Sequence, residues 1–364
     1  MNFLKKLFGK TNEPIKSYED FWNWFEKNEK IFFNAVKQRR NIEKDFFDKL
    51  SLKLNELKDG FSYLTGMYNA DTVELVLTAD GAVKNIVFVE ELVDAAPKIE
   101  GWKFTALKPA LDGKDVGIEM AGYKFNTENL GFYSNEHGEY PDEIDITIVH
   151  KDFNEENKTT ITSGTFIFLD NYLGELDFVT TIDNLKVISK EEAQKELIPV
   201  EKLKAYLTWR QKEFIEKYEG VRRNTENDNY SILEAKLKSG NALIATINTG
   251  LLNWDSKASH PWILKVEIKY DGKNNNGMPS TETLKLLDEI ESKIVEELKD
   301  FEGYLNIGRQ TADSVREIYF ACKEFRKPSK VLHKIQNDHS NKVEISYDIY
   351  IDKYWQSFNR FNNN

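Results

Sequence analysis

Segments that alternate apolar and polar residues are interleaved with amphipathic segments along the last third of the chain, and this pattern most constrains the fold. In the clearest of them every second residue is apolar, namely Leu264, Val266, Ile268 and Tyr270. Residues 343–351 repeat that alternation, which is typical of a strand with one face in water. Between these two segments, Ser280 can cap a helix whose apolar residues form one stripe, namely Leu284, Leu287, Ile290, Ile294 and Leu298. In this region the apolar residues recur with a period of two in some segments and of 3.6 in others, which predicts an α+β fold.

The other segments of residues 230–364 complete an order of elements. Residues 233–238 and 241–247 flank Ser239-Gly240, a two-residue hairpin signal. Further strands are expected at 304–307 and 315–322, and a helix at 329–336. The resulting order is β-β-β-α-β-β-α-β, which without its leading hairpin is the β-α-β-β-α-β unit of ferredoxin-like folds.

The first 220 residues predict an antiparallel sheet with flanking helices. Ser17 and Asp20 form a capping box before two aromatic-rich helices, at 17–36 and 42–57. Asp80-Gly81 is expected to turn a hairpin from a strand at 73–77 to a return strand at 86–89. Further strands are expected at 102–107, 118–125, 130–133, 144–149 and 178–187. Helical periodicity predicts a helix at 159–169, before Gly174, and another closes the region near 199–219.

The length of 364 residues favours two domains. We expect a flexible N-terminus at 1–16, an α+β domain at 17–220, a linker at 221–229 and the ferredoxin-like domain at 230–364. The linker has one apolar residue among arginines, asparagines and acids. The start, Met1–Lys10, lacks the continuous apolar core of a secretory signal, so at most it touches a membrane surface.

Charge and cysteine usage limit the partners and the compartment. The net charge of −11 repels phosphate backbones, which disfavours nucleic acid as a partner. The single cysteine, Cys322, excludes an internal disulfide and a zinc thiolate cluster, as expected of a cytoplasmic protein. No apolar run is long enough for a transmembrane helix.

The motifs of common catalytic and cofactor sites are missing, so we predict no catalytic, cofactor-binding or metal-binding residue. No histidine pair has metal-ligand spacing, and no G-x-S-x-G, P-loop or G-x-G-x-x-G pattern occurs. Asp271 to Glu282 resembles a calcium loop, but Lys273 and Asn276 stand where a ligand and the turn glycine belong. Cys322 alternates with apolar residues and is expected to be a buried hydrophobe. Of the five histidines, namely His137, His150, His260, His333 and His339, we expect His260 in a turn and the last two on the solvent-facing side of a basic helix.

We expect the clusters of charged residues to lie mainly on the solvent-exposed surface. Asp142, Glu143 and Asp145 precede a strand, and Asp348 and Asp352 share the polar side of the last one. Acid–base chemistry would need one of these carboxyls to be desolvated. Basic residues gather at Arg222-Arg223 and between Lys323 and Lys334, where we expect a solvated helix face.

Several C-terminal segments resemble a bacterial family named only as domain of unknown function 695. The resemblance covers Asn229 to the end and rests on five segments, namely Leu237–Asn248, Pro261-Trp262, Tyr304–Thr311, Ile318–Phe320 and Asp352–Trp355. It implies a ferredoxin-like fold and no established activity. A more distant, fold-level likeness is to the bacterial inhibitor of ribonuclease E, and it transfers no residue.

These observations favour a non-catalytic intracellular module that binds another protein through a face or an edge strand of a sheet. The first alternative is a hydrolase-like enzyme with its site at the domain junction. Trp102, Trp209 and Trp254 are the candidate residues to line that site. An RNA-associated regulator that uses the basic helix after Lys323 is the second.

Overall fold

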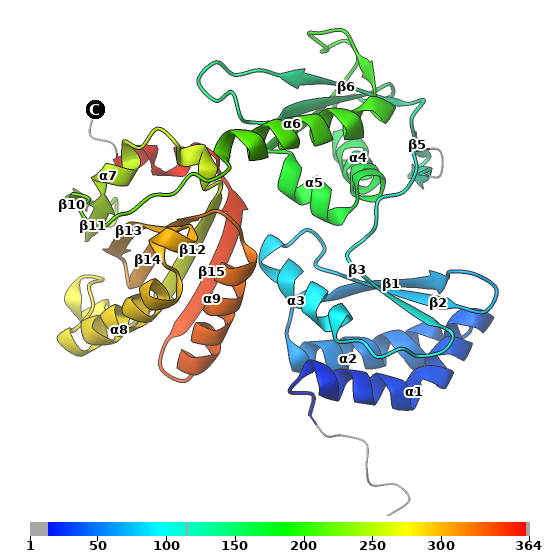
Figure 1. Ribbon diagram of the computed structural model, residues 1–364, viewed down its shortest axis with the longest axis horizontal. Helices are drawn as coiled ribbons and strands as arrows, with labels where there is room; N and C mark the ends of the chain where they lie inside the picture. The colour runs from blue at the N-terminus through cyan, green and yellow to red at the C-terminus, as the bar shows by residue number, and fades with distance from the viewer. Residues whose placement is uncertain (1–13, 114–115, 362–364) are drawn as a thin grey trace, which may run out of the picture. The chain divides into compact units, whose positions relative to one another are not determined.

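The computed structural model describes residues 14–113 and 116–361, which divide into two compact units (Figure 1). The first unit consists of Met1–Leu111 and Leu173–Leu176, and the second of Asp112–Tyr172 and Asp177–Asn364. The segment Met1–Lys10 lies outside the described residues. The units divide at Leu111, whereas the expected linker 221–229 lies inside the second unit, so a domain boundary there stays a prediction.

In the first unit an aromatic-rich helix packs against a three-stranded sheet. Helix α1 (Tyr18–Gln38) is followed by a π-helical turn (Glu43–Phe47) and α2 (Asp48–Leu57), which confirms the two predicted helices. The sheet has the order β1 (Ser62–Met67), β2 (Val73–Thr78), β3 (Trp102–Ala106). The ring of Phe25 on α1 meets Trp102 at 4.9 Å and Phe104 at 5.4 Å, edge-on in both cases. The aromatic stripe of α1 is therefore core, as its spacing predicts.

The expected return strand at 86–89 is wrong, because these residues belong to helix α3 (Val83–Asp94). The run of β-branched residues indicates a strand, but Ile86, Val89 and Leu92 recur at helical spacing and all three are fully buried. As a crossover helix, α3 lets β3 pair with β2 in parallel, so the sheet is mixed rather than antiparallel.

A short excursion of the chain, Leu173–Leu176, is anchored in the first unit by a buried carboxylate. Glu175 accepts hydrogen bonds from Thr78 Oγ1 (2.5 Å) and from the backbone N–H groups of Gly81 and Lys108 (3.1 Å each). Gly174 precedes it at φ +85°, where an added Cβ would lie 2.9 Å from the backbone nitrogen of Ala110. This close approach explains why glycine stands there.

The N-terminal half of the second unit has a four-stranded sheet in the order β8-β7-β6-β9. Its strands are β6 (Leu130–Asn135), β7 (Asp145–His150), β8 (Asn184–Ile188) and β9 (Ile198–Pro199). The helices are α4 (Lys158–Leu173), α5 (Glu175–Thr181) and α6 (Leu203–Tyr218), so the helices expected at 159–169 and near 199–219 are confirmed.

Two strand predictions in this region need correction. The strand expected at 178–187 begins inside α5, and only residues from Asn184 onward pair, in parallel with β7. The strand expected at 118–125 is a small hairpin of β4 (Ile118–Met120) and β5 (Tyr123–Phe125), because Ala121 and Gly122 turn the chain with positive φ.

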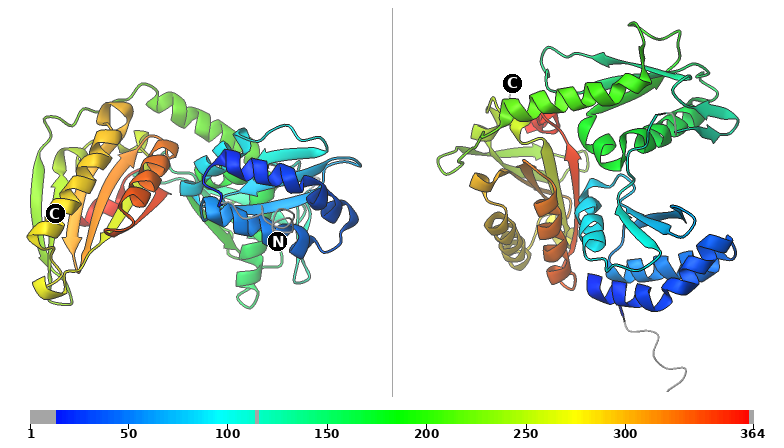
Figure 2. Two further views of the ribbon diagram at one scale, coloured as in Figure 1. Left: turned by 90° about the horizontal axis from the view of Figure 1, so that it is seen from below. Right: turned by 45° about the vertical axis from the view of Figure 1, so that its right-hand side comes forward.

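The C-terminal half of the second unit is built on a six-stranded sheet in the order β10-β11-β13-β14-β12-β15. The strands are β10 (Tyr230–Lys236), β11 (Ala242–Asn248), β12 (Trp262–Lys269), β13 (Tyr304–Ala312), β14 (Val315–Cys322) and β15 (Glu344–Ile351). Helices α8 (Thr281–Glu297) and α9 (Arg326–His339) lie side by side on one face (Figure 2). The other face packs against α7 (Thr249–Leu252) and the 3-10 helix Gln356–Phe361. The six strands and the helices α8 and α9 follow one another in the predicted order, and the short helix α7 is an addition to it.

No helix in the described ranges is long and apolar enough to cross a membrane.

Candidate functional site

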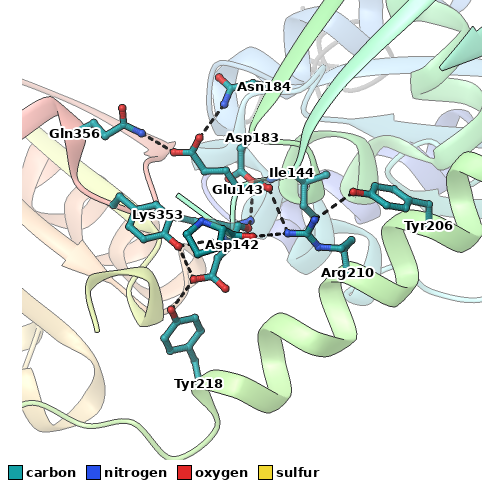
Figure 3. Close-up of polar contacts among 12 residues, drawn as sticks. Asp142, Glu143, Ile144, Asp183, Asn184, Tyr206, Arg210, Tyr218, Lys353 and Gln356 are labelled. Atoms are coloured by element: carbon teal, nitrogen blue, oxygen red, sulfur yellow. Dashed lines mark hydrogen bonds and ion pairs between the residues drawn. The ribbon is translucent and has the colours of Figure 1, made fainter. Parts of the chain in front are cut away.

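Several polar side chains meet where residues 141–144, 183–184, 206–218 and 353–356 of the second unit come together (Figure 3). We refer to this set as the Asp142 network, with the members Asp142, Glu143, Asp183, Arg210, Lys217, Tyr218, Lys353, Tyr354 and Gln356. It links the two halves of the second unit, because Lys353, Tyr354 and Gln356 follow the last strand of the C-terminal half.

Asp142, in the loop before β7, accepts more hydrogen bonds than any other carboxylate of the network. Lys217 Nζ donates to both of its oxygens, at 2.8 and 2.9 Å, and the hydroxyls of Tyr218 and Tyr354 donate at 2.7 and 2.5 Å. Burial opposes ionisation of this carboxyl, but the three donors together outweigh it and lower its pKa. Asp142 is therefore ionised at neutral pH.

Asp183 and Lys353 form a buried ion pair beside it. Lys353 Nζ lies 2.6 Å from Asp183 Oδ2, and each side chain is only 6% exposed. The ammonium also donates to the backbone oxygen of Asp142 at 2.9 Å, while Oδ2 accepts from Ile144 N at 2.7 Å. Burial raises the pKa of Asp183 by more than the charge of Lys353 lowers it. Asp183 Oδ1 is buried without a hydrogen-bond partner in the described chain.

Glu143 and Arg210 extend the network on either side. Glu143 accepts from Gln356 Nε2 at 2.5 Å and from Asn184 Nδ2 at 3.3 Å. Burial and, to a smaller extent, the charge of Asp183 raise its pKa. Arg210 on α6 donates to the backbone oxygen of Pro141 at 2.7 Å, which holds the loop before β7 against the helix.

Divergent carboxyl pKa values are a feature of acid–base catalysts, so the network is the place to look for chemistry. Two hollows, of about 340 and 460 Å³, border it in the described part of the chain. Both are lined by Asp142, whose oxygens already accept from three side chains. The acids with raised pKa values, Glu143 and Asp183, line neither hollow. This arrangement suits a joint between two halves of a unit better than a reaction centre.

The three tryptophans proposed as linings of a junction site have different surroundings. Trp209 is exposed and lines the smaller hollow with Arg210 and Phe214. Trp254 packs against His260 and Trp355, with ring centroids 5.4 and 6.1 Å away. Trp102 belongs to the core of the first unit. Of the predicted linings, the structure thus places Trp209 beside the network.

Cys322, His260 and His339 have the surroundings of structural residues rather than of reactive groups. Cys322 is fully buried, and burial raises the pKa of its thiol well above the usual range, as expected of a core residue. His339 is also buried and contacts the backbone oxygen of Ile335 at 2.9 Å, so its expected exposure to solvent is wrong. His260 is buried in its turn, and burial first, then Lys323 and Arg222, lower its pKa to about 3. No metal-binding group of three His, Cys, Asp or Glu occurs among the described residues.

A second candidate site is the outer edge of the six-stranded sheet. Strand β10 ends the strand order and pairs with β11 alone. Its Ile232 is 71% exposed, which makes it the most exposed large apolar side chain in the described chain. Tyr230 is 53% exposed and Ile244 on β11 is 39% exposed. We define these three residues as the β10 surface. Ser239-Gly240 predicts the hairpin but not its exposure, because alternation alone does not tell which face is covered.

Comparison with known protein families gives a match in the C-terminal half of the second unit. Residues 228–361 match the model of the Family of unknown function (DUF695). The resemblance expected from Asn229 onward is therefore confirmed. It covers the C-terminal half of the second unit, including β10 and the residues Lys353 to Gln356 that join the Asp142 network. Searches of curated proteins and of solved structures each returned no match. The likeness to the ribonuclease E inhibitor stays a prediction.

Proposed function

We propose that this protein is a non-catalytic cytoplasmic module that binds another protein at the β10 surface. The single observation that carries the proposal is the exposed edge of the six-stranded sheet, where Ile232 stands in solvent on a strand with one neighbour. An unpaired strand edge is a template for association with another chain, and Ile232 adds an exposed apolar side chain to it.

The composition of this edge supports binding. Ile232, Tyr230 and Ile244 lie on one face of the hairpin, because Ile232 pairs with Thr246, and Ile244 pairs with Glu234. Full burial of one isoleucine side chain contributes about 2 kcal/mol, and a buried tyrosine adds apolar area with a hydroxyl for a hydrogen bond. The β10 surface therefore offers the anchors that the centre of a small interface needs.

The fold supplies a rigid support for this surface. Strands β12 to β15 with α8 and α9 follow one another as β-α-β-β-α-β, which supports a ferredoxin-like assignment for residues 230–361. Hairpin β10–β11 is added to this unit at β13 and extends the sheet past the two covering helices. The other face of the hairpin is fixed, because Ala245 and Ile247 of β11 belong to the core of the sheet.

A hydrolase-like enzyme at the Asp142 network is the second candidate, and the divergent carboxyl pKa values favour it. This alternative needs substrate access to Glu143 or Asp183. Their present partners, Gln356, Asn184 and Lys353, occupy the positions that a substrate would take.

Quantitative capture from a native extract at low salt tests the proposal. We expect the full chain to retain one stoichiometric partner, and Ile232→Lys to lose it. Ile31→Lys, which changes an exposed isoleucine of α1, is the matched control and should retain it. Equal retention by Ile232→Lys and the wild type would refute binding at the β10 surface, as would no stoichiometric partner at any salt concentration.

A further inference from the structure

The backbone of β10 presents every second amide to the outside of the sheet. Leu237 N donates to Asn241 O at 2.9 Å, and Thr249 N donates to Asn229 O at 2.9 Å, at the two ends of the β10–β11 ladder. In an antiparallel ladder the residues that bond to the neighbour alternate with residues that do not. Odd-numbered residues therefore point their N–H and C=O groups at β11, and Tyr230, Ile232, Glu234 and Lys236 point theirs outward.

The four residues whose backbone groups point outward also have exposed side chains. No hydrogen bond within the described ranges uses the outward N–H or C=O groups of Tyr230, Ile232, Glu234 or Lys236. An extended segment laid along this edge would meet both unpaired backbone groups and the side chain of Ile232. A helix laid on the β10 surface would leave these backbone groups unpaired, so the edge suits a strand.

The charges beside the edge indicate the chemistry of that strand. Glu234 stands on β10 itself and has no ion-pair partner in the described chain. Asp300 accepts hydrogen bonds from Thr225 and from Phe301 N, but no cation lies within ion-pair distance of it in the same residues. Asp300 also lies close enough to Tyr230 for its charge to raise the pKa of that phenol, after the larger effect of burial. Glu234 thus faces outward two positions from Ile232, while Asp300 lies near Tyr230 at one end of β10 and Lys236 is the outward cation at the other end.

A second copy of this chain fits the edge poorly. The chain carries a net charge of −11, so two copies repel each other over their surfaces as a whole. Like charges at an interface oppose association and slow the encounter. A partner with lysine or arginine next to Glu234 or Asp300 would have the opposite effect.

We infer that the β10 edge binds an extended, basic segment of a partner protein, which adds a strand to the sheet with an apolar residue on Ile232 and a cationic residue toward Glu234 or Asp300. This inference rests on the proposed function and names the mode and chemistry of its partner. Main-chain hydrogen bonds would supply the affinity, and alternate side chains the specificity.

Selection from a random ten-residue peptide library on the immobilised full chain tests the inference. We expect enriched peptides to alternate apolar residues with lysine or arginine and to lack proline. Their affinity, measured by fluorescence anisotropy with a labelled peptide, should fall about tenfold on Glu234→Gln or Asp300→Asn, since each removes one charge pair. Ile31→Lys should bind like the wild type, and thermal unfolding confirms that each variant is folded.

The outcomes separate this inference from the proposed function. Enriched peptides that are acidic, or apolar at every third or fourth position, would overturn the strand and charge assignment and would leave protein binding at Ile232 standing. Affinity unchanged in Glu234→Gln, Asp300→Asn and the double variant would overturn the charge assignment. Peptides that bind Ile232→Lys as tightly as the wild type would overturn both the inference and the proposed binding surface.

Discussion

Lys353 Nζ and Asp183 Oδ2 lie 2.6 Å apart, and both side chains are withdrawn from solvent. The pair connects the segment before β8 with the segment after β15. A buried ion pair adds little when it is intact, but removal of one partner leaves an uncompensated charge in the interior. The pair therefore ties the two halves of the second unit together.

Lys353→Met should lower the free energy of unfolding by about 3–5 kcal/mol, because Asp183 is left buried and unpaired. Addition of Asp183→Asn should restore part of the loss, since the amide oxygen still accepts from Ile144 N and carries no charge. Chemical denaturation of the two single variants and the double variant measures this coupling. Lys269→Met, which breaks an exposed pair with Glu344, is the control and should change stability little. Additive effects of the two substitutions would show that the pair is not coupled.

Asp142→Asn should destabilise the protein at neutral pH by roughly 2 kcal/mol, after allowance for partial exposure. The folded-state pKa of Asp142 is below the ordinary value of 3.8, so its contribution is fully present above that value. It is lost as pH falls through the lowered pKa, and the stabilities of wild type and variant should converge there. Denaturation curves from pH 7 to acid measure the difference. Glu216→Gln on α6 should show no such convergence, and a gap that stays constant with pH would contradict the assignment.

Gly164→Ala should destabilise the second unit by about 1–3 kcal/mol. Gly164 lies on α4 against the fully buried ring of Phe125, and an added Cβ would stand 2.1 Å from Phe125 Cζ. Gly66→Ala on β1, where an added Cβ meets nothing within 4 Å, is the control. Thermal unfolding compares the two, and equal stability would mean that the ring of Phe125 can move aside.

Cys322 should resist thiol reagents in the folded protein. Burial raises the pKa of its thiol, so the reactive thiolate is scarce as well as inaccessible. Modification by a disulfide reagent, followed by absorbance, should proceed at the rate of unfolding and become fast in denaturant. Fast modification of the native protein would place Cys322 near the surface.

Much of the C-terminal half could be predicted because its elements are signalled locally. Strict alternation marks β12 and β15, and Ser280 caps α8 by accepting from Thr283 N at 3.1 Å. The sequence favours a strand at α3 because its β-branched residues have strand propensity. The parallel pairing of β2 with β3, which needs a crossover helix between them, is not visible in the sequence.

The Asp142 network could not be predicted from the sequence. Asp142, Asp183 and Lys353 are far apart along the chain, and each follows or precedes a strand in the same way as an ordinary surface residue. Only the three-dimensional arrangement brings them together. The sequence also does not reveal that the β10 edge is exposed, because this depends on which strands end the sheet.

Residue-resolved amide exchange along β10 tests the central claim most directly. In the free protein we predict slow exchange for Leu233 and Ala235, which point toward β11, and fast exchange for Ile232 and Glu234. A bound partner should slow exchange at Ile232 and Glu234. The account would be contradicted by slow exchange at Ile232 and Glu234 in the free protein, or by a bound partner that leaves both amides fast.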